Sequence, residues 1–210
     1  MFERARRQMI ETQIAGRGVR DPRVLAAMAE VPREAFVGPD LQASAYEDRA
    51  LPIADGQSIS QPYIVAVMLE AARLAAAARV LEVGTGSGYA AAILSRLAAH
   101  VFTIERHADL AEAAKARCQA VGCHNITFRT GDGTKGWPEE APFDAILVAA
   151  SGSEAPEALK RQLAIGGRLI IPVGGSDVQH LLRLTRMADA RFECDDLGSV
   201  HFVPLVGAEG

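Results

Sequence analysis

The sequence has few cysteines, no long apolar run and little clustering of charge. Its 210 residues include only Cys118, Cys123 and Cys194, an odd and sparse set that indicates a reduced cytoplasmic protein rather than a disulfide scaffold. No apolar run approaches the ~18 residues of a membrane span. The charged first residues do not resemble a signal peptide. We therefore expect a cytoplasmic protein that is not held in a membrane.

Basic patches and metal-ligand patterns are also missing. The net charge is −4 and the arginines cluster only at residues 4–7, which we expect on the solvated face of a first helix. Because proteins that neutralise many phosphates usually carry a basic face, we expect no nucleic-acid partner. Cys118 and Cys123 lie near His124 in the chain, but the spacing matches no known zinc pattern and no second pair follows. We expect no metal.

The order of expected elements indicates one α/β domain, residues 1–210, in two parts. Residues 1–78 have helical stretches at 2–15, 22–29 and from 61 onward, with no strand pattern, and an irregular loop at 37–60 that is long enough to be functional. Expected strands follow at 80–83, 101–104, 126–130, 145–148 and 168–173, separated by helices at 90–98, 108–121 and 157–163. Strand-like segments at 181–186, 191–194 and 199–205 end the chain. This order predicts a mostly parallel seven-stranded sheet with helices on both faces and a closing antiparallel pair.

The stretch 80–89 is the most informative part of the chain. An apolar run ends at Glu82, glycines then occupy alternate positions, and a helical segment follows. Dinucleotide sites read G-x-G-x-x-G, whereas Tyr89 stands where their last glycine would be. The E-x-G-x-G-x-G pattern resembles the first motif of Rossmann-like class I methyltransferases, whose cofactor S-adenosyl-L-methionine has no phosphates. The cofactor-binding candidates of this motif are Glu82, Gly84, Thr85, Gly86, Ser87 and Gly88.

Acidic residues end the next two strands. Glu105 lies 21 residues after Gly84 (105 − 84), where an acidic side chain accepts hydrogen bonds from ribose hydroxyls, and Arg106 follows it. Asp132 and Gly133 follow the third strand, in position for an adenine amino group. Taken alone, Glu105 is better interpreted as a surface acid, and Asp132 can be interpreted as a turn residue. Together, at the carboxyl ends of successive parallel strands, they predict an adenosine-type ligand.

The segment after the fourth strand carries no base and no metal ligand. Residues 148–153 are small and uncharged, without the Asn- or Asp-Pro-Pro-aromatic motif common in amine methyltransferases or the aspartates of metal-dependent catechol-type enzymes. The five histidines form no cluster in the sequence. A site without a base suits a nucleophile that is already ionised, such as a carboxylate. Methyl transfer to a carboxylate is helped by desolvation and alignment rather than by proton transfer.

The segment Gly56-Gln-Ser-Ile-Ser-Gln-Pro62 ends the long loop. Ser60 comes just before the expected helix start at Gln61-Pro62. One interpretation makes Ser60 the N-cap of that helix. The other makes its hydroxyl a donor to a substrate carboxylate, assisted by amides at the helix start.

Motifs along essentially the whole chain resemble those of bacterial protein-L-isoaspartate O-methyltransferases. The matching segments are Asp21–Val24, Val31–Phe36, Ala45–Asp48, Leu51–Ile53, Gly56–Tyr63, Leu81–Tyr89, Glu105-Arg106, Gly131–Gly133, Gly136-Trp137, Ala141–Ile146, Gln162-Leu163, Gly166-Gly167, Pro172–Gly174 and Phe202–Leu205. The Gln-Ser-Ile-Ser-Gln-Pro segment is the specific one, although Ser58 stands where threonine is usual.

The resemblance implies an activity and a role for each candidate residue. Ser60 is the implied active-site serine, and the implied substrate is the free α-carboxylate of isoaspartyl residues in damaged proteins, whose methyl ester collapses to a succinimide. The implied peptide contacts are Ser58, Ile59 and the backbone near Val203. S-adenosyl-L-methionine is the implied donor, S-adenosyl-L-homocysteine the product, and we expect a monomer. A methyltransferase of a small molecule or RNA, or a cofactor-binding module without catalysis, are the alternatives.

Overall fold

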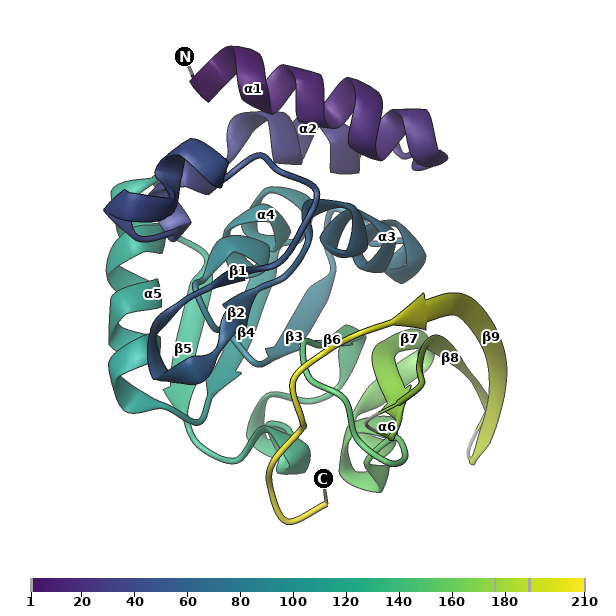
Figure 1. Cartoon of the computed structure of the whole chain (residues 1–210). Helices are drawn as coiled ribbons and strands as arrows, with labels where there is room; N and C mark the ends of the chain where they lie inside the picture. The colour runs from purple at the N-terminus through teal and green to yellow at the C-terminus, as the bar shows by residue number, and fades with distance from the viewer. Residues whose placement is uncertain (1, 176, 189, 210) are drawn as a thin grey trace.

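A seven-stranded sheet forms the centre of the molecule. The computed structural model describes residues 2–175, 177–188 and 190–209 (Figure 1). The strands lie in the order β5-β4-β3-β6-β7-β8-β9, and only the pairs β7–β8 and β8–β9 are antiparallel. Their bounds are β3 Arg79–Val83, β4 His100–Glu105, β5 Ile126–Thr130, β6 Phe143–Val148, β7 Leu163–Gly174, β8 Gln179–Ala188 and β9 Arg191–Val200. The predicted Rossmann-like fold is confirmed, and its strand order reverses beside β3, where such sheets bind ligands.

Both faces of the sheet are covered, by unequal layers. Strand residues alternate between the layers, so that Val80 and Val101 join one apolar cluster while Leu81 and Phe102 join the other. The thicker layer contains α3 Pro62–Ala72, α4 Tyr89–Leu97 and α5 Ala108–Ala120. The opposite face is covered by the short α6 Glu157–Arg161 and by loops. No helix among the described residues is long and apolar enough to cross a bilayer.

The N-terminal part is a helical cap over α4 and α3 (Figure 1). It begins with α1 Phe2–Gln8, a π-helical turn Met9–Ile14 and a 3-10 turn Ala15–Arg17. Helix α2 Pro22–Glu30 follows, and its N-cap is Asp21, whose carboxylate accepts the amide of Arg23 at 2.8 Å. An aspartate at the N-cap and a proline at the first helical position are typical of a helix start.

The loop predicted at 37–60 is more ordered than its sequence indicates. One 3-10 turn precedes it, η3 Arg33–Phe36, and two lie within it, η4 Pro39–Ser44 and η5 Ala54–Gly56. Strands β1 Leu51–Pro52 and β2 Ser58–Ile59 pair antiparallel within it. The expectation of no strand before residue 79 was therefore wrong. Two-residue strands are too short to produce a periodic pattern.

The C-terminal expectations hold only in part. The closing antiparallel pair is confirmed as β8 and β9, but the separate strand predicted at 199–205 was wrong because β9 is continuous to Val200. The chain after it is irregular, and the amide of Leu205 bonds to the carbonyl of Ser151 at 2.8 Å. The predicted helix 157–163 ends at Arg161, since β7 already begins at Leu163. In Figure 1 this tail crosses below the sheet toward the C-terminus.

Candidate active site

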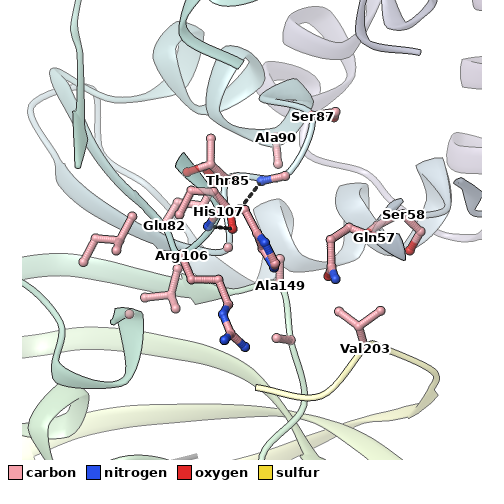
Figure 2. Close-up of a pocket in the computed structure, with 18 of the residues that line it drawn as sticks. Gln57, Ser58, Glu82, Thr85, Ser87, Ala90, Arg106, His107, Ala149 and Val203 are labelled. Carbon is pink, nitrogen blue, oxygen red and sulfur yellow. Dashed lines mark hydrogen bonds between the residues drawn. The ribbon is translucent and has the colours of Figure 1, made fainter. Parts of the chain in front are cut away.

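A pocket lies at the carboxyl ends of β3, β4 and β6, where the strand order reverses. It encloses about 100 Å³, and about 820 Å³ when the open space at its mouth is counted. We call it the glycine-loop pocket, after the glycine loop Gly84–Gly88. Its lining residues are 57–60, Val65, 82–87, Tyr89, Ala90, 104–107, Gly133, Ala149, Ala150 and 203–206. Figure 2 shows Glu82, Thr85 and Arg106 toward one side of it, and Gln57, Ser58 and Val203 toward the other.

The glycine loop takes a backbone path that other residues rarely adopt. Gly84, Gly86 and Gly88 have φ of 91°, 53° and 90°, in the left-handed region. The amide of Gly84 bonds to the carbonyl of Ile104 at 2.9 Å, which ties the loop to the next strand. Gly88 does not line the pocket, but it starts α4 so close to α5 that an added Cβ would lie 3.1 Å from the Cβ of Ala114. The predicted glycines are therefore needed for both loop shape and packing.

A buried carboxylate lies at the base of the pocket. Glu82 is 2% exposed and accepts a hydrogen bond from the Thr103 hydroxyl at 2.6 Å, and that hydroxyl is 2.6 Å from the hydroxyl of Thr85. Burial raises the pKa of Glu82 to about 8, helped by the nearby charge of Glu105 and opposed by the Thr103 hydrogen bond. Without a ligand this carboxyl group keeps its proton at neutral pH, and a cationic neighbour would favour its ionised form.

Glu105 fixes the loop from the neighbouring strand. Its two carboxylate oxygens accept the amide of Gly86 at 2.8 Å and the amide of His107 at 3.1 Å (Figure 2). The side chain is 5% exposed and lines the pocket, so it is not a surface acid. Each oxygen keeps a lone pair for a further donor, such as a ligand hydroxyl.

The serine loop, Gln57–Gln61, forms the opposite wall. Helix α3 has Gln61 as its N-cap, without a side-chain cap bond, so the N-cap interpretation of Ser60 was wrong. The structure gives the Ser60 hydroxyl no hydrogen bond to any described residue, whereas its carbonyl accepts Nη2 of Arg33 at 2.8 Å. Ser58, Ile59 and Ser60 all line the glycine-loop pocket. The Ser60 hydroxyl is therefore available to a ligand.

A second cavity adjoins this wall. We call it the serine-loop cavity, and its lining residues are 48–50, Ser58, Ser60, Gln61, Ile64, Ala149 and 199–203. It shares Ser58, Ser60, Ala149 and Val203 with the glycine-loop pocket. Ser60 thus lies where two cavities meet.

Asp132 lies apart from the other predicted cofactor residues. Its Oδ1 accepts the amide and hydroxyl of Thr134 at 3.0 and 2.6 Å, and its Oδ2 accepts the amide of Ala208 in the C-terminal tail at 2.9 Å. Partial burial opposes ionisation, but these hydrogen bonds lower the pKa of Asp132 overall. Only the neighbouring Gly133 lines the pocket. The carboxylate already holds the tail in place.

Sequence reasoning missed several lining residues. Ala149 and Ala150 lie at the end of β6, where small size rather than chemistry matters, since the Cβ of Ala149 would be 3.4 Å from a Cβ on Gly84. The tail residues 204–206 reach the pocket through long-range backbone bonds that leave no local pattern. His107 comes from the turn after β4, next to the predicted Arg106. Within the described ranges, no three His, Cys, Asp or Glu side chains are placed to hold a metal ion.

Comparisons with known proteins identify the family of this chain. The family model of protein-L-isoaspartate(D-aspartate) O-methyltransferase matches residues 4–210. The chain is 60% identical to a protein-L-isoaspartate O-methyltransferase of Methylorubrum populi, covering 100% of both chains, and 56% identical to one of Rhodopseudomonas palustris, covering 96% of this chain and 93% of that one.

Solved structures agree with these relatives. A structure named protein-L-isoaspartate O-methyltransferase superposes with a TM-score of 0.87 at 30% identity, over 98% of this chain and 67% of that chain. A Plasmodium falciparum protein described by the same name, in complex with S-adenosyl-L-homocysteine, gives 0.84 at 28% identity over 96% and 98%. The resemblance read from the sequence is confirmed. The chain belongs to the protein-L-isoaspartate (D-aspartate) O-methyltransferase family, enzymes that use S-adenosyl-L-methionine to methylate isoaspartyl residues of proteins.

Proposed function

We propose that methyl transfer to the isoaspartyl carboxylate takes place at Ser60, where the glycine-loop pocket meets the serine-loop cavity. The observation that carries the assignment is that Ser60 lines both cavities. A donor in one cavity and an acceptor in the other would meet at this residue. Because the ester formed collapses to a succinimide that hydrolyses partly to normal aspartate, the reaction begins the repair of a damaged protein.

The glycine-loop pocket fits S-adenosyl-L-methionine. Among the described residues no cation forms an ion pair with Glu82, whose raised pKa marks it as a carboxylate in need of a positive neighbour. An amino-acid ammonium group meets that need. In this assignment Glu82 and 84–87 hold the methionine end, on a loop whose shape Gly88 sets, and Glu105 and Arg106 hold the ribose side. Gly133 meets the adenine end, in a turn that the Asp132 carboxylate fixes. Bound there, S-adenosyl-L-methionine supplies an electrophilic methyl group.

Ser60 orients the nucleophile. Its free hydroxyl donates a hydrogen bond to one oxygen of the substrate carboxylate, which leaves the other oxygen directed toward the glycine-loop pocket. Ser58 and Ile59 extend the same wall, and Val203 lines both cavities on the same side (Figure 2). No base is needed, since a carboxylate is ionised at neutral pH.

Transfer of label to two matched peptides tests this assignment. An isoaspartyl peptide and its normal aspartyl counterpart are offered with methyl-labelled S-adenosyl-L-methionine. We expect label in the isoaspartyl peptide only, and a loss of about 100-fold in kcat/KM for Ser60→Ala, because the reacting oxygen is no longer held in line with the methyl group and a misplacement of about 1 Å can cost this much.

Ser153→Ala is the matched control. Ser153 is exposed and lies outside the lining of both cavities, so its variant should keep the wild-type rate. Wild-type activity in Ser60→Ala, with normal cofactor binding, would remove Ser60 from the site. Label in neither peptide despite cofactor binding would contradict the whole assignment.

We further propose a cytoplasmic monomer without a nucleic-acid partner. Residues 1–78 and 79–210 share one apolar cluster, which supports a single domain. All three cysteines are free thiols and the net charge is −4, which supports a reducing compartment and a protein ligand rather than a phosphate polymer. Light scattering should give a mass near 22.3 kDa, and a doubled mass would contradict the monomer.

A further inference from the structure

A fully buried arginine lies behind the serine loop. Arg33 is 0% exposed, and it donates from Nε to the carbonyl of Ala45 and from Nη2 to the carbonyl of Ser60, both at 2.8 Å. The side chain of Tyr89 is its remaining polar neighbour, and among the described residues no carboxylate balances the charge. A buried cation without a counter-ion is costly, so apolar packing alone does not account for an arginine here.

The same guanidinium rests on the first residue of the helix that follows the glycine loop. Its Cζ lies 4.9 Å from the centroid of the Tyr89 ring, and Phe36 meets that ring edge-on at 5.7 Å. Tyr89 also lines the glycine-loop pocket. A dinucleotide-binding loop has glycine at this position, which offers no such surface. The aromatic face stabilises the cation and joins the serine loop to the start of α4.

We propose that Arg33 is the positioning residue for Ser60. By holding the Ser60 carbonyl against the start of α4, it sets the direction of the Ser60 hydroxyl relative to the glycine-loop pocket. The carbonyl and hydroxyl of one serine lie within ~4 Å of each other, so a shift of the first moves the second. The unbalanced positive charge also favours the approach of an anionic group to Ser60. This inference rests on the proposed role of Ser60.

A double-mutant cycle on kcat/KM for an isoaspartyl peptide tests the inference. Lysine keeps the charge of Arg33 but lacks the fixed fork that reaches two carbonyls. We expect Arg33→Lys to lower kcat/KM about 10-fold when Ser60 is present, because small misplacements of a reacting group are costly. Once Ser60 is alanine, the same change should cost less than about 2-fold, since there is no hydroxyl left to misplace. Calorimetric affinity for S-adenosyl-L-methionine should stay within about 3-fold.

Arg23→Lys is the matched control for this cycle. Arg23 also donates to two carbonyls, those of Leu74 and Leu97, but it ties α2 to the core without touching the serine loop. Its effect should be the same with and without Ser60. If the lysine variant of Arg33 does not bind the cofactor, Arg33→Gln provides a second cycle.

The outcomes separate the two proposals. An equal loss from Arg33→Lys in both Ser60 backgrounds overturns the inference and leaves the role of Ser60 intact. No loss from Ser60→Ala alone overturns the role of Ser60 instead. Loss of cofactor binding in both Arg33 variants, with Arg23→Lys intact, shows that Arg33 supports the fold at large, and this also overturns the inference.

Discussion

The two walls of the glycine-loop pocket are held in place by different means. The glycine loop continues directly from β3, and its backbone bonds to the next strand through the amides of Gly84 and Thr85. The serine loop has only the two-residue pairing of β2 with β1 as regular structure, and its Ser60 end is held by side chains, with Arg33 on the Ser60 carbonyl and Gln61 on the carbonyl of Asp48. In the proposed assignment the first wall meets one invariant cofactor, while the second meets many proteins that differ around the damaged residue. A wall fixed by backbone hydrogen bonds suits a ligand that never changes. A wall fixed by side-chain contacts can be altered by single substitutions without disturbing the sheet.

Gly88→Ala gives the sharpest test of the backbone-built wall. Gly88 has φ of 90°, and an added Cβ would lie 3.1 Å from both the Cβ of Ala114 and Sγ of Cys118. We expect a loss of about 3 kcal/mol in the free energy of unfolding, from backbone strain and from the forced separation of α4 and α5. Urea denaturation measures it.

Gly122→Ala separates strain from contact. Gly122 has φ of 75°, but nothing lies within 4 Å of an added Cβ. This control should therefore lose only about 1 kcal/mol. Equal losses of unfolding free energy at the two positions would show that the close packing of Gly88 against α5 does not stabilise the glycine loop.

Glu105→Ala tests the side chain that connects this wall to its ligand. It removes the acceptor for the amides of Gly86 and His107 and one proposed acceptor for the ribose hydroxyls. We expect calorimetry to show about 30-fold weaker binding of S-adenosyl-L-methionine, equivalent to about 2 kcal/mol, with the peptide KM changed far less. Glu112→Ala, an exposed position on α5, is the control and should bind normally. Unchanged affinity in Glu105→Ala would exclude Glu105 from the site.

The sequence predicts the glycine wall well because its signal is local. Glu82, the glycines and Glu105 lie at the ends of strands whose apolar runs are visible in the sequence, and the structure brings them to one pocket. Asp132 shows the limit of this reasoning. Its place after β5 was right, but its carboxylate is engaged by Ala208, 76 residues away in the chain, a contact with no local pattern.

The serine wall is predictable only through family resemblance. The strand pair β1–β2 spans two residues on each side, too few for periodicity to appear. Arg33 lies in a segment whose sequence predicts a turn, and no neighbouring residue indicates that its side chain is completely buried. Its partners lie 12 and 27 residues away. Contacts of this kind form only when the tertiary fold is complete.

Glu82→Gln should change how stability depends on pH. Burial raises the pKa of Glu82 to about 8 from 4.5, so between these values the folded protein keeps a proton that the unfolded chain releases. Wild-type stability without cofactor should therefore fall as pH rises through this window, by up to about 1.4 kcal/mol per pH unit, and level off above it. Glu82→Gln should remove this part of the slope, whereas Glu112→Gln should keep it. Denaturation at several pH values measures the slopes, and identical slopes in all three proteins would mean that Glu82 is ionised throughout.

Arg17→Met probes the support of the serine wall with the smallest expected effect. The Arg17 guanidinium pairs with Asp48 at 2.6 Å and lies 3.5 Å above the Tyr63 ring, so it joins segments on either side of the serine loop. Arg129 is a close match, also 44% exposed, paired with Glu139 and stacked on Trp137, but remote from both cavities.

Replacing either arginine by methionine should therefore lower the free energy of unfolding by a similar amount, but only the change at Arg17 should affect peptide binding. Because both ion pairs are solvated, we expect Arg17→Met and Arg129→Met each to lose less than about 1 kcal/mol of unfolding free energy. Only Arg17→Met should raise the peptide KM, by about 3-fold with kcat unchanged, since Asp48 lines the serine-loop cavity and is no longer held. An equal KM change in both variants would mean that general loosening, rather than the contact with Asp48 and Tyr63, sets peptide affinity. Arg33 would then remain the one side chain proposed to position the serine loop, and Arg17 would contribute only general stability.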